Sequence, residues 1–217
     1  MISSEEKATA DSSISDLSNK LKRLQISLGG ATGVLGSTFV RWGRTSCPSN
    51  GTEMVYKGYV GGSHYTHTGA ATDYLCLPEE PIWGHFEGAS QSGAKVYGGE
   101  YQFDGRTRKN FFGKEVEQHD APCVVCHTKR NSMLMIPGRN QCYEGWTLEY
   151  YGYLSAGHIT HKAGSQYVCA DAQLEVMPNS GANKNGKLFY FVEAKCGSLP
   201  CPPYVADREL SCVVCSK

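Results

Sequence analysis

Near the start of the chain, apolar residues recur at spacings of three and four, and most positions between them are polar. The apolar positions are Ile14, Leu17, Leu21, Leu24 and Leu28. This spacing is the a/d pattern of a heptad repeat over two heptads. It predicts a short, coiled-coil-like amphipathic helix within residues 14–30, because two consecutive glycines at 29 and 30 would end it.

A helix of about fifteen residues is marginal by itself in water, so its apolar stripe needs a partner. One interpretation places the helix against its own domain. The other makes it an oligomerisation helix that joins two or three copies of the chain, because the stripe is narrow and its flanks are polar. Residues 1–13 are polar and lack periodicity, which predicts a flexible segment.

After residue 36 the pattern becomes typical of β-strands. The stretches 38–42, 53–59, 146–153 and 187–192 are rich in aromatic and β-branched residues, and Gly, Pro, Asn and Ser separate them. No second helix is predicted. The pattern favours a mainly β fold built from antiparallel sheets.

The same features occur twice in this β region. His64 and His67 are followed 94 positions later by His158 and His161, and a Cys-Val-Val-Cys motif stands at 123–126 and again at 212–215. Self-similarity at a fixed offset is the signature of duplicated structural units. We therefore predict two tandem, pseudo-symmetric β repeats, at residues 37–130 and 131–217.

The chain has ten cysteines, and an even number in a Gly- and Tyr-rich sequence favours disulfides in an oxidising compartment. We expect each Cys-Val-Val-Cys motif to bond to the two other cysteines of its repeat, in an order that the sequence leaves open. The first set is Cys47, Cys76, Cys123 and Cys126, the second is Cys142, Cys169, Cys212 and Cys215, and the remaining pair is Cys196 and Cys201.

A competing interpretation makes the two Cys-Val-Val-Cys motifs one zinc site with four thiolate ligands, whose spacing they satisfy. It would leave two cysteines of each repeat without a role. A thioredoxin-like redox motif is disfavoured because the surrounding βαβ pattern is missing.

Two glycine-flanked loops, GGSHYTHTG at 61–69 and SAGHITHKAG at 155–164, carry the candidate site residues. Their four histidines could converge on a metal ion. They could instead form hydrogen bonds within the fold, or belong to a polar surface that binds a neutral sugar through aromatic rings and short hydroxyls. For the ligand-binding alternative, the candidate residues are His64, Tyr65, His67, Asp73, His158, His161 and Tyr167; for the metal alternative, they are His64, His67, His158 and His161.

Charge and motif content exclude several functions. The 21 basic and 21 acidic residues balance, so no attraction to nucleic acid or an anionic membrane is predicted. No apolar run approaches the roughly 18 residues of a membrane span, and no catalytic or cofactor-binding motif is present. We expect a secreted chain whose leader has been removed, with no enzymatic activity and no cofactor. The glycosylation sequon at Asn50 agrees with secretion.

The chain resembles the non-collagenous domain of sponge short-chain (spongin-type) collagens and related secreted marine-invertebrate proteins. It is also similar to two-repeat galactose-binding egg lectins of sea hares. The segments that carry the resemblance are 39–48, 58–71, 74–78, 121–126 and 194–204, within residues 37–217. No Gly-X-Y tract is present, and the heptad helix stands where a collagen stalk would end.

Together, the sequence and the resemblance imply a secreted lectin-like protein, with one shallow carbohydrate site in each repeat. Oligomerisation through residues 14–28 would make such sites multivalent. The alternatives are an extracellular-matrix assembly domain related to short-chain collagens and a histidine-based metal-binding protein.

Overall fold

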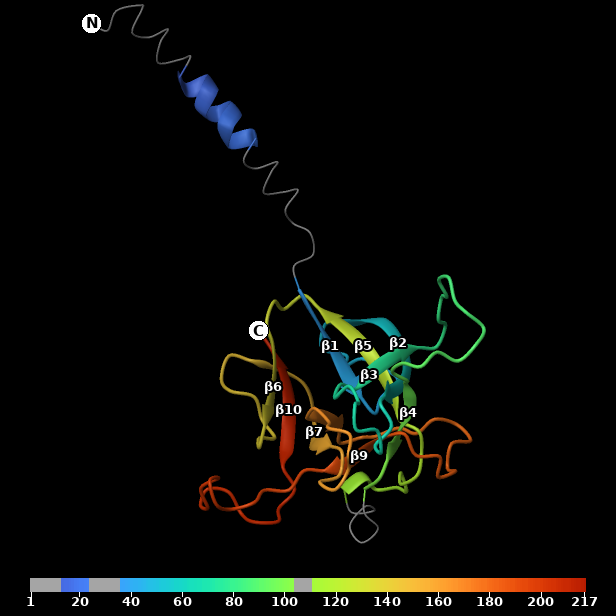
Figure 1. Ribbon diagram of the computed structural model, residues 1–217. Coiled ribbons are helices and arrows are strands. Elements are labelled where there is room, and N and C mark those ends of the chain that lie inside the picture. Colours follow the sequence, from blue (N-terminus) through green and yellow to red (C-terminus); the bar gives the residue numbers. More distant parts are fainter. Residues whose placement is uncertain (1–12, 24–35, 104–110) are drawn as a thin grey trace, which may run out of the picture. The chain divides into compact units, whose positions relative to one another are not determined.

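The computed structural model describes residues 13–23, 36–103 and 111–217 (Figure 1). A helix spans residues 13–23 and belongs to one unit, and the strands belong to a second unit that starts at residue 36. Within the described part of the chain, no helix is long and apolar enough to cross a membrane.

The helix leaves its apolar stripe open to solvent. The side chains of Ile14, Leu17 and Leu21 are 65%, 65% and 59% exposed. Lys20 forms an ion pair with Asp16 at 3.1 Å, one turn away, which stabilises an isolated helix by only about 0.2 to 0.5 kcal/mol. The predicted flexible segment, apart from residue 13, and the predicted continuation of the helix over 24–30 lie outside the described residues.

The second unit is mainly β, as predicted. Its ten strands are β1 (Ser37–Trp42), β2 (Thr52–Gly62), β3 (Leu75–Pro78), β4 (Tyr97–Tyr101), β5 (Pro122–Thr128), β6 (Met133–Pro137), β7 (Thr147–Ala156), β8 (Val168–Asp171), β9 (Lys187–Phe191) and β10 (Ser211–Ser216). The four stretches that the sequence pattern identified fall in β1, β2, β7 and β9.

The strands form one sheet in the order β6-β10-β7-β8-β1-β5-β2-β4-β9, and β3 also pairs with β2. In the first half, β5 pairs with β1 and β2, and β2 pairs with β3 and β4. In the second half, β10 pairs with β6 and β7, and β7 pairs with β8 and β9. All eight pairs are antiparallel.

The prediction of antiparallel sheets is confirmed only in part, because the sheet is mixed. Two pairs are parallel, β1 with β8 and β4 with β9, and each joins a strand of the first half to one of the second. Parallel neighbours need a long connection between them, and only strands far apart in the chain have one.

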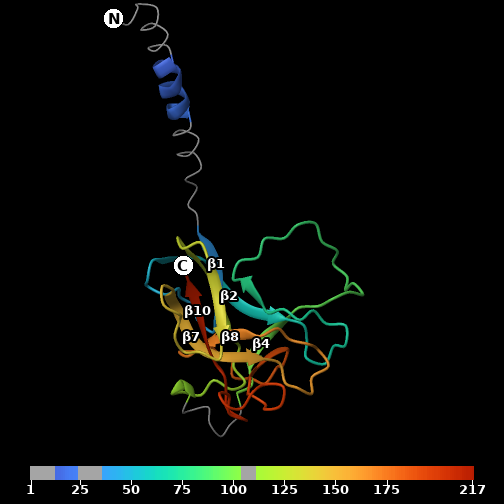
Figure 2. The same ribbon diagram turned by 90° about the vertical axis from the view of Figure 1, so that its left-hand side faces the viewer.

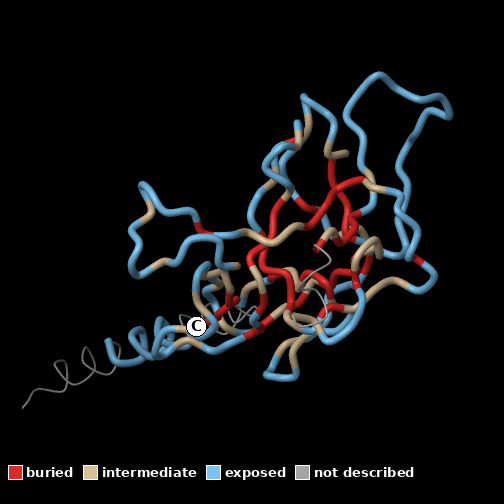
Figure 3. The backbone as a smooth tube through the Cα atoms, turned by 90° about the horizontal axis from the view of Figure 1, so that it is seen from below, coloured by how far each residue is buried: buried red, intermediate tan, exposed pale blue. Residues whose placement is uncertain are grey.

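Side chains from both halves share the core. One cluster contains Trp42 and Tyr101 together with Phe189, and a second contains Val124 together with Tyr150. Buried positions concentrate among the central strands, while long exposed loops surround them (Figure 3). Residues 36–217 therefore form one unit rather than two independent ones.

All ten cysteines form disulfides. The bonds are Cys47–Cys126, Cys76–Cys123, Cys142–Cys215, Cys169–Cys212 and Cys196–Cys201. Each Cys-Val-Val-Cys motif thus bonds to the other two cysteines of its half, and the structure supplies the order. The four-thiolate zinc alternative is wrong, because no cysteine is free.

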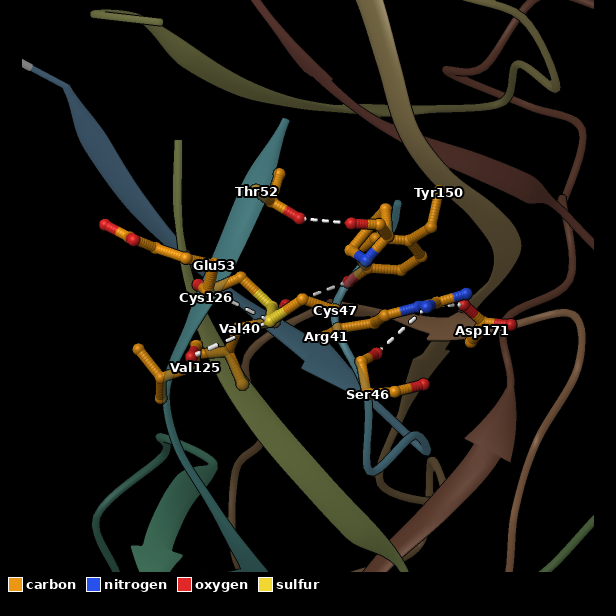
Figure 4. The surroundings of a disulfide bond; sticks show 11 residues. Val40, Arg41, Ser46, Cys47, Thr52, Glu53, Val125, Cys126, Tyr150 and Asp171 are labelled. Atoms are coloured by element: carbon orange, nitrogen blue, oxygen red, sulfur yellow. Dashed lines mark hydrogen bonds and ion pairs between the residues drawn. A yellow bond between two sulfur atoms is a disulfide. The ribbon is translucent and has the colours of Figure 1, made fainter. Parts of the chain in front are cut away.

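Polar contacts also join the halves near the Cys47–Cys126 bond (Figure 4). Arg41 Nε on β1 donates to Asp171 Oδ2 on β8 at 2.6 Å, and both side chains are nearly buried. The buried Tyr150 hydroxyl on β7 lies 3.0 Å from the Val40 carbonyl oxygen on β1. These contacts reinforce the boundary where β1 meets β8.

Gly58 on β2 and Gly152 on β7 permit a close approach of neighbouring strands. A Cβ atom at Gly58 would overlap the carbonyl oxygen of Leu77 on β3. One at Gly152 would overlap the carbonyl oxygen of Ala170 on β8. Because the obstacle is backbone in both cases, neither strand pair can accommodate a side chain here.

Gly152→Ala is expected to lower the free energy of unfolding by about 1 to 3 kcal/mol, the usual cost of overpacking. Gly98→Ala on β4 is the matched control, because a Cβ there meets nothing within 4 Å. Denaturant unfolding of both variants measures the difference. Equal stability of the two would contradict the close approach at Gly152.

The disulfides should contribute unequally. Cys47–Cys126 spans 79 residues and Cys196–Cys201 only 5, so chain entropy assigns them about 4.5 and about 2 kcal/mol. We expect the double serine variant of the first pair to lose more stability in thermal unfolding than that of the second. Cys126 is also fully buried, which adds a packing cost to its replacement.

Candidate functional site

Both His-x-x-His loops are turns that follow the longest strands. The first begins just after β2 ends, and its His67 amide donates to the His64 carbonyl at 3.0 Å. The second follows β7, and its His161 amide donates to the His158 carbonyl at 3.0 Å. A turn was the condition for bringing histidines three positions apart onto one side, since on a strand they would face opposite sides.

Each histidine pair packs against one tyrosine. The rings of His64 and His67 lie 5.0 and 5.5 Å from that of Tyr97, measured between centroids. The rings of His158 and His161 lie 5.0 and 5.5 Å from that of Tyr190. Tyr97 is on β4 and Tyr190 is on β9, the strands that pair with the ends of β2 and β7.

Tyr65 connects the two clusters. Its ring lies 4.7 Å from that of His64 and 4.6 Å from that of His161. Its carbonyl also accepts a hydrogen bond from the Ala163 amide at 3.0 Å. Ile159 occupies the corresponding position of the second loop and is 95% exposed. The seven rings are His64, Tyr65, His67, Tyr97, His158, His161 and Tyr190, and we call them the ring series.

Lys187 joins the segments that follow the two loops. Its Nζ donates to the Thr72 carbonyl at 2.8 Å and to the Gly164 carbonyl at 3.2 Å. It also lies 4.7 Å from the centroid of the Tyr74 ring. The residue is buried, and burial lowers the pKa of its ammonium group, while the Asp73 carboxylate acts in the opposite direction.

The environment of His161 favours its neutral form. Burial lowers the pKa of its imidazole, and the nearby His158 lowers it further. The His158 amide donates to Nδ1 of His161 at 3.2 Å, so this nitrogen is an acceptor and the neutral ring carries its proton on Nε2. Burial also raises the pKa of the Tyr190 hydroxyl.

A pocket of about 430 Å³ adjoins the first loop. Its lining residues are Ser63, Thr66, His67, Thr68, Gly69, Ala70, Gly93, Ala94 and Lys95. Gly93, Ala94 and Lys95 lie at the end of the loop between β3 and β4. This loop is the green segment that extends away from the strands in Figures 1 and 2. The pocket thus has one wall from the first His-x-x-His loop and another from the loop between β3 and β4.

The structure brings five of the seven predicted ligand residues into the ring series. The other two, Asp73 and Tyr167, are exposed and lie outside it. The four histidines do not form a metal-ligand group: in the described part of the chain, no three His, Cys, Asp or Glu side chains are close enough to hold an ion.

Sequence reasoning missed four residues of this region. Tyr97 and Tyr190 occupy equivalent positions in the two halves of the sequence. This match could have identified them as partners of the equivalent histidine loops. Lys95 and Lys187 gave no signal in the sequence. Lys95 reaches the pocket through the course of the loop between β3 and β4, and Lys187 lies beside the loops because β9 pairs with β4 and β7. Compared with known protein families, the chain matches no family model.

Lys187→Met is expected to lower the free energy of unfolding by about 1.5 to 3 kcal/mol, because the carbonyls of Thr72 and Gly164 lose a charged donor that a buried lysine supplies. Lys162→Met is the control, because Lys162 is exposed in the second loop. Chemical denaturation compares the variants. If Lys187→Met were as stable as the control, the lysine would not hold the two segments together.

Proposed function

We propose that this chain is a secreted carbohydrate-binding protein without catalytic activity, and that it binds sugar around the two His-x-x-His loops. The observation that carries this proposal is the pocket beside the first loop, next to the ring series. Its volume of about 430 Å³ falls in the roughly 300 to 1,000 Å³ range of small-ligand sites.

The chemistry of this region suits a sugar. A sugar ring has an apolar C–H face, which packs on aromatic side chains, and hydroxyls, which bond to short polar groups. The ring series supplies the aromatic groups. The pocket supplies the hydroxyls of Ser63, Thr66 and Thr68.

A tandem duplication of residues 37–130 and 131–217 explains the arrangement most simply. It is supported by the matching strand pairs, the matching disulfides, the paired glycines at 58 and 152, and the two three-ring clusters. In this proposal each half contributes one shallow site, and Tyr65 makes the first different from the second.

An extracellular location is part of the proposal. Five disulfides are consistent with an oxidising, extracellular compartment. Asn50 of the sequon is exposed in the turn before β2, where a glycan would meet solvent. The resemblance to secreted invertebrate proteins points the same way.

Oligomerisation through residues 14–28 would raise the avidity of weak sites, often by about 10² to 10⁴. The exposed stripe formed by Ile14, Leu17 and Leu21 supports this step. A dimer or trimer would bury it, as a heptad pattern requires.

A second candidate is assembly in an extracellular matrix. It is favoured by the loop between β3 and β4, where Ile82, Trp83 and Phe86 are 97%, 75% and 71% exposed. Apolar side chains gathered at an exposed loop are typical of contact surfaces. Filaments without saturable sugar binding would favour this candidate over the lectin.

A glycan array tests the lectin proposal. The His64→Ala/His158→Ala double variant should lose most of the binding shown by the native chain, because it removes one histidine ring from each of the two clusters. His85→Ala is the control, since its side chain is 92% exposed and makes only a loose contact with Glu87. Unchanged binding by the double variant would remove these loops from the site.

A further inference from the structure

We infer that the pocket beside the first His-x-x-His loop binds the acidic group of a sugar, a sulfate ester or a carboxylate. The inference rests on the proposed function and narrows its ligand class. Its basis is the distribution of hydrogen-bond donors and charges around the pocket.

Lys95 provides a positive charge that no carboxylate of the described residues neutralises. Its Nζ lies 3.2 Å from the Ser90 hydroxyl, and among the ion pairs of the described residues none includes it. The pocket lining contains no Asp or Glu. An ammonium group has donors and no acceptor, so it favours ligand oxygens that carry negative charge.

His67 differs from the other three histidines of the loops. Nδ1 of His64 lies 2.9 Å from the Thr66 hydroxyl, and Nδ1 of His158 lies 2.9 Å from that of Thr160. Nδ1 of His161 accepts the His158 amide. Among the described residues, neither ring nitrogen of His67 has a hydrogen-bond partner.

The His67 imidazole is therefore free to donate into the pocket that it lines. One ring N–H is available in its neutral form and two when it is protonated. His67 and Lys95 line the same pocket from two different loops, so a ligand there can accept hydrogen bonds from both.

The hydroxyls point to the same chemistry. Ser63 Oγ accepts a hydrogen bond from the Ala71 amide at 3.1 Å, which leaves its O–H free to donate. Thr68 lines the same wall. The small residues Gly69 and Gly93 leave room, since a Cβ at either meets nothing within 4 Å. The pocket therefore has a positive charge, several hydrogen-bond donors and space beside both loops. These properties fit an anionic group with several acceptor oxygens.

The second loop lacks this arrangement. Lys162 stands at the position of Thr68, and it is exposed. Lys187, which contacts Thr72 and Gly164, is committed to these two backbone carbonyls. The preference for an acidic group therefore belongs to the first loop, and Lys129, which is exposed and lies outside both loops, supplies a control.

The test uses an array of matched glycans, each neutral sugar beside its sulfated and its carboxylate-bearing forms, for example lactose, sulfated lactose and sialylated lactose. The native chain should bind acidic members at least about tenfold more tightly than their neutral parents at low salt. This preference should shrink as salt is raised, because screening weakens exposed charge pairs. The sulfated and sialylated arms show which acidic group is preferred.

Lys95→Met should remove most of the preference, Lys95→Arg should retain it, and Lys129→Met, at an exposed lysine outside both loops and the pocket lining, should leave it unchanged. Equal binding of acidic and neutral glycans, or an undiminished preference in Lys95→Met, overturns the inference and leaves sugar binding intact. Binding to no glycan overturns it together with the proposed function. Inorganic sulfate that competes as well as sulfated lactose shows that an ion, not a sugar, is recognised, and also overturns it.

Discussion

The fold depends on two strands, β5 and β10, that are each covalently bonded on both of their faces. The two cysteines of each strand are three positions apart, so their side chains leave opposite faces of the sheet. Cys126 bonds to Cys47 before β2, and Cys123 bonds to Cys76 on β3. These strands pair with the long strands that end at the His-x-x-His loops, so the crosslinks also fix the bases of the candidate site.

The sequence predicted the strands and the sets of bonded cysteines because both depend on local patterns and spacing. It did not predict the parallel pairs β1–β8 and β4–β9, because these arise where two halves meet and no local pattern encodes that contact. The same limit applies to the site. The histidine loops were visible in the sequence, whereas Lys95 enters the pocket only through the course of the loop between β3 and β4.

The two loops have the same backbone turn, and each packs against a tyrosine of its own, yet their chemistry differs. Tyr65 packs on His161 of the other loop, while Ile159 at the corresponding position extends into solvent. Among the residues that the structure describes, the ring nitrogens of His67 have no hydrogen-bond partner, whereas Nδ1 of His161 accepts the His158 amide. These differences give the two loops different chemical surroundings.

The shared core has a consequence for biosynthesis. Trp42 and Tyr101 are made before Phe189, with which they pack, and Asp171 follows Arg41 by 130 residues. A nascent chain that carries only the first half on the ribosome must therefore keep aromatic surface unburied, a condition that promotes aggregation. Native packing of this core therefore requires the strands of the second half, which supply Phe189 and Asp171.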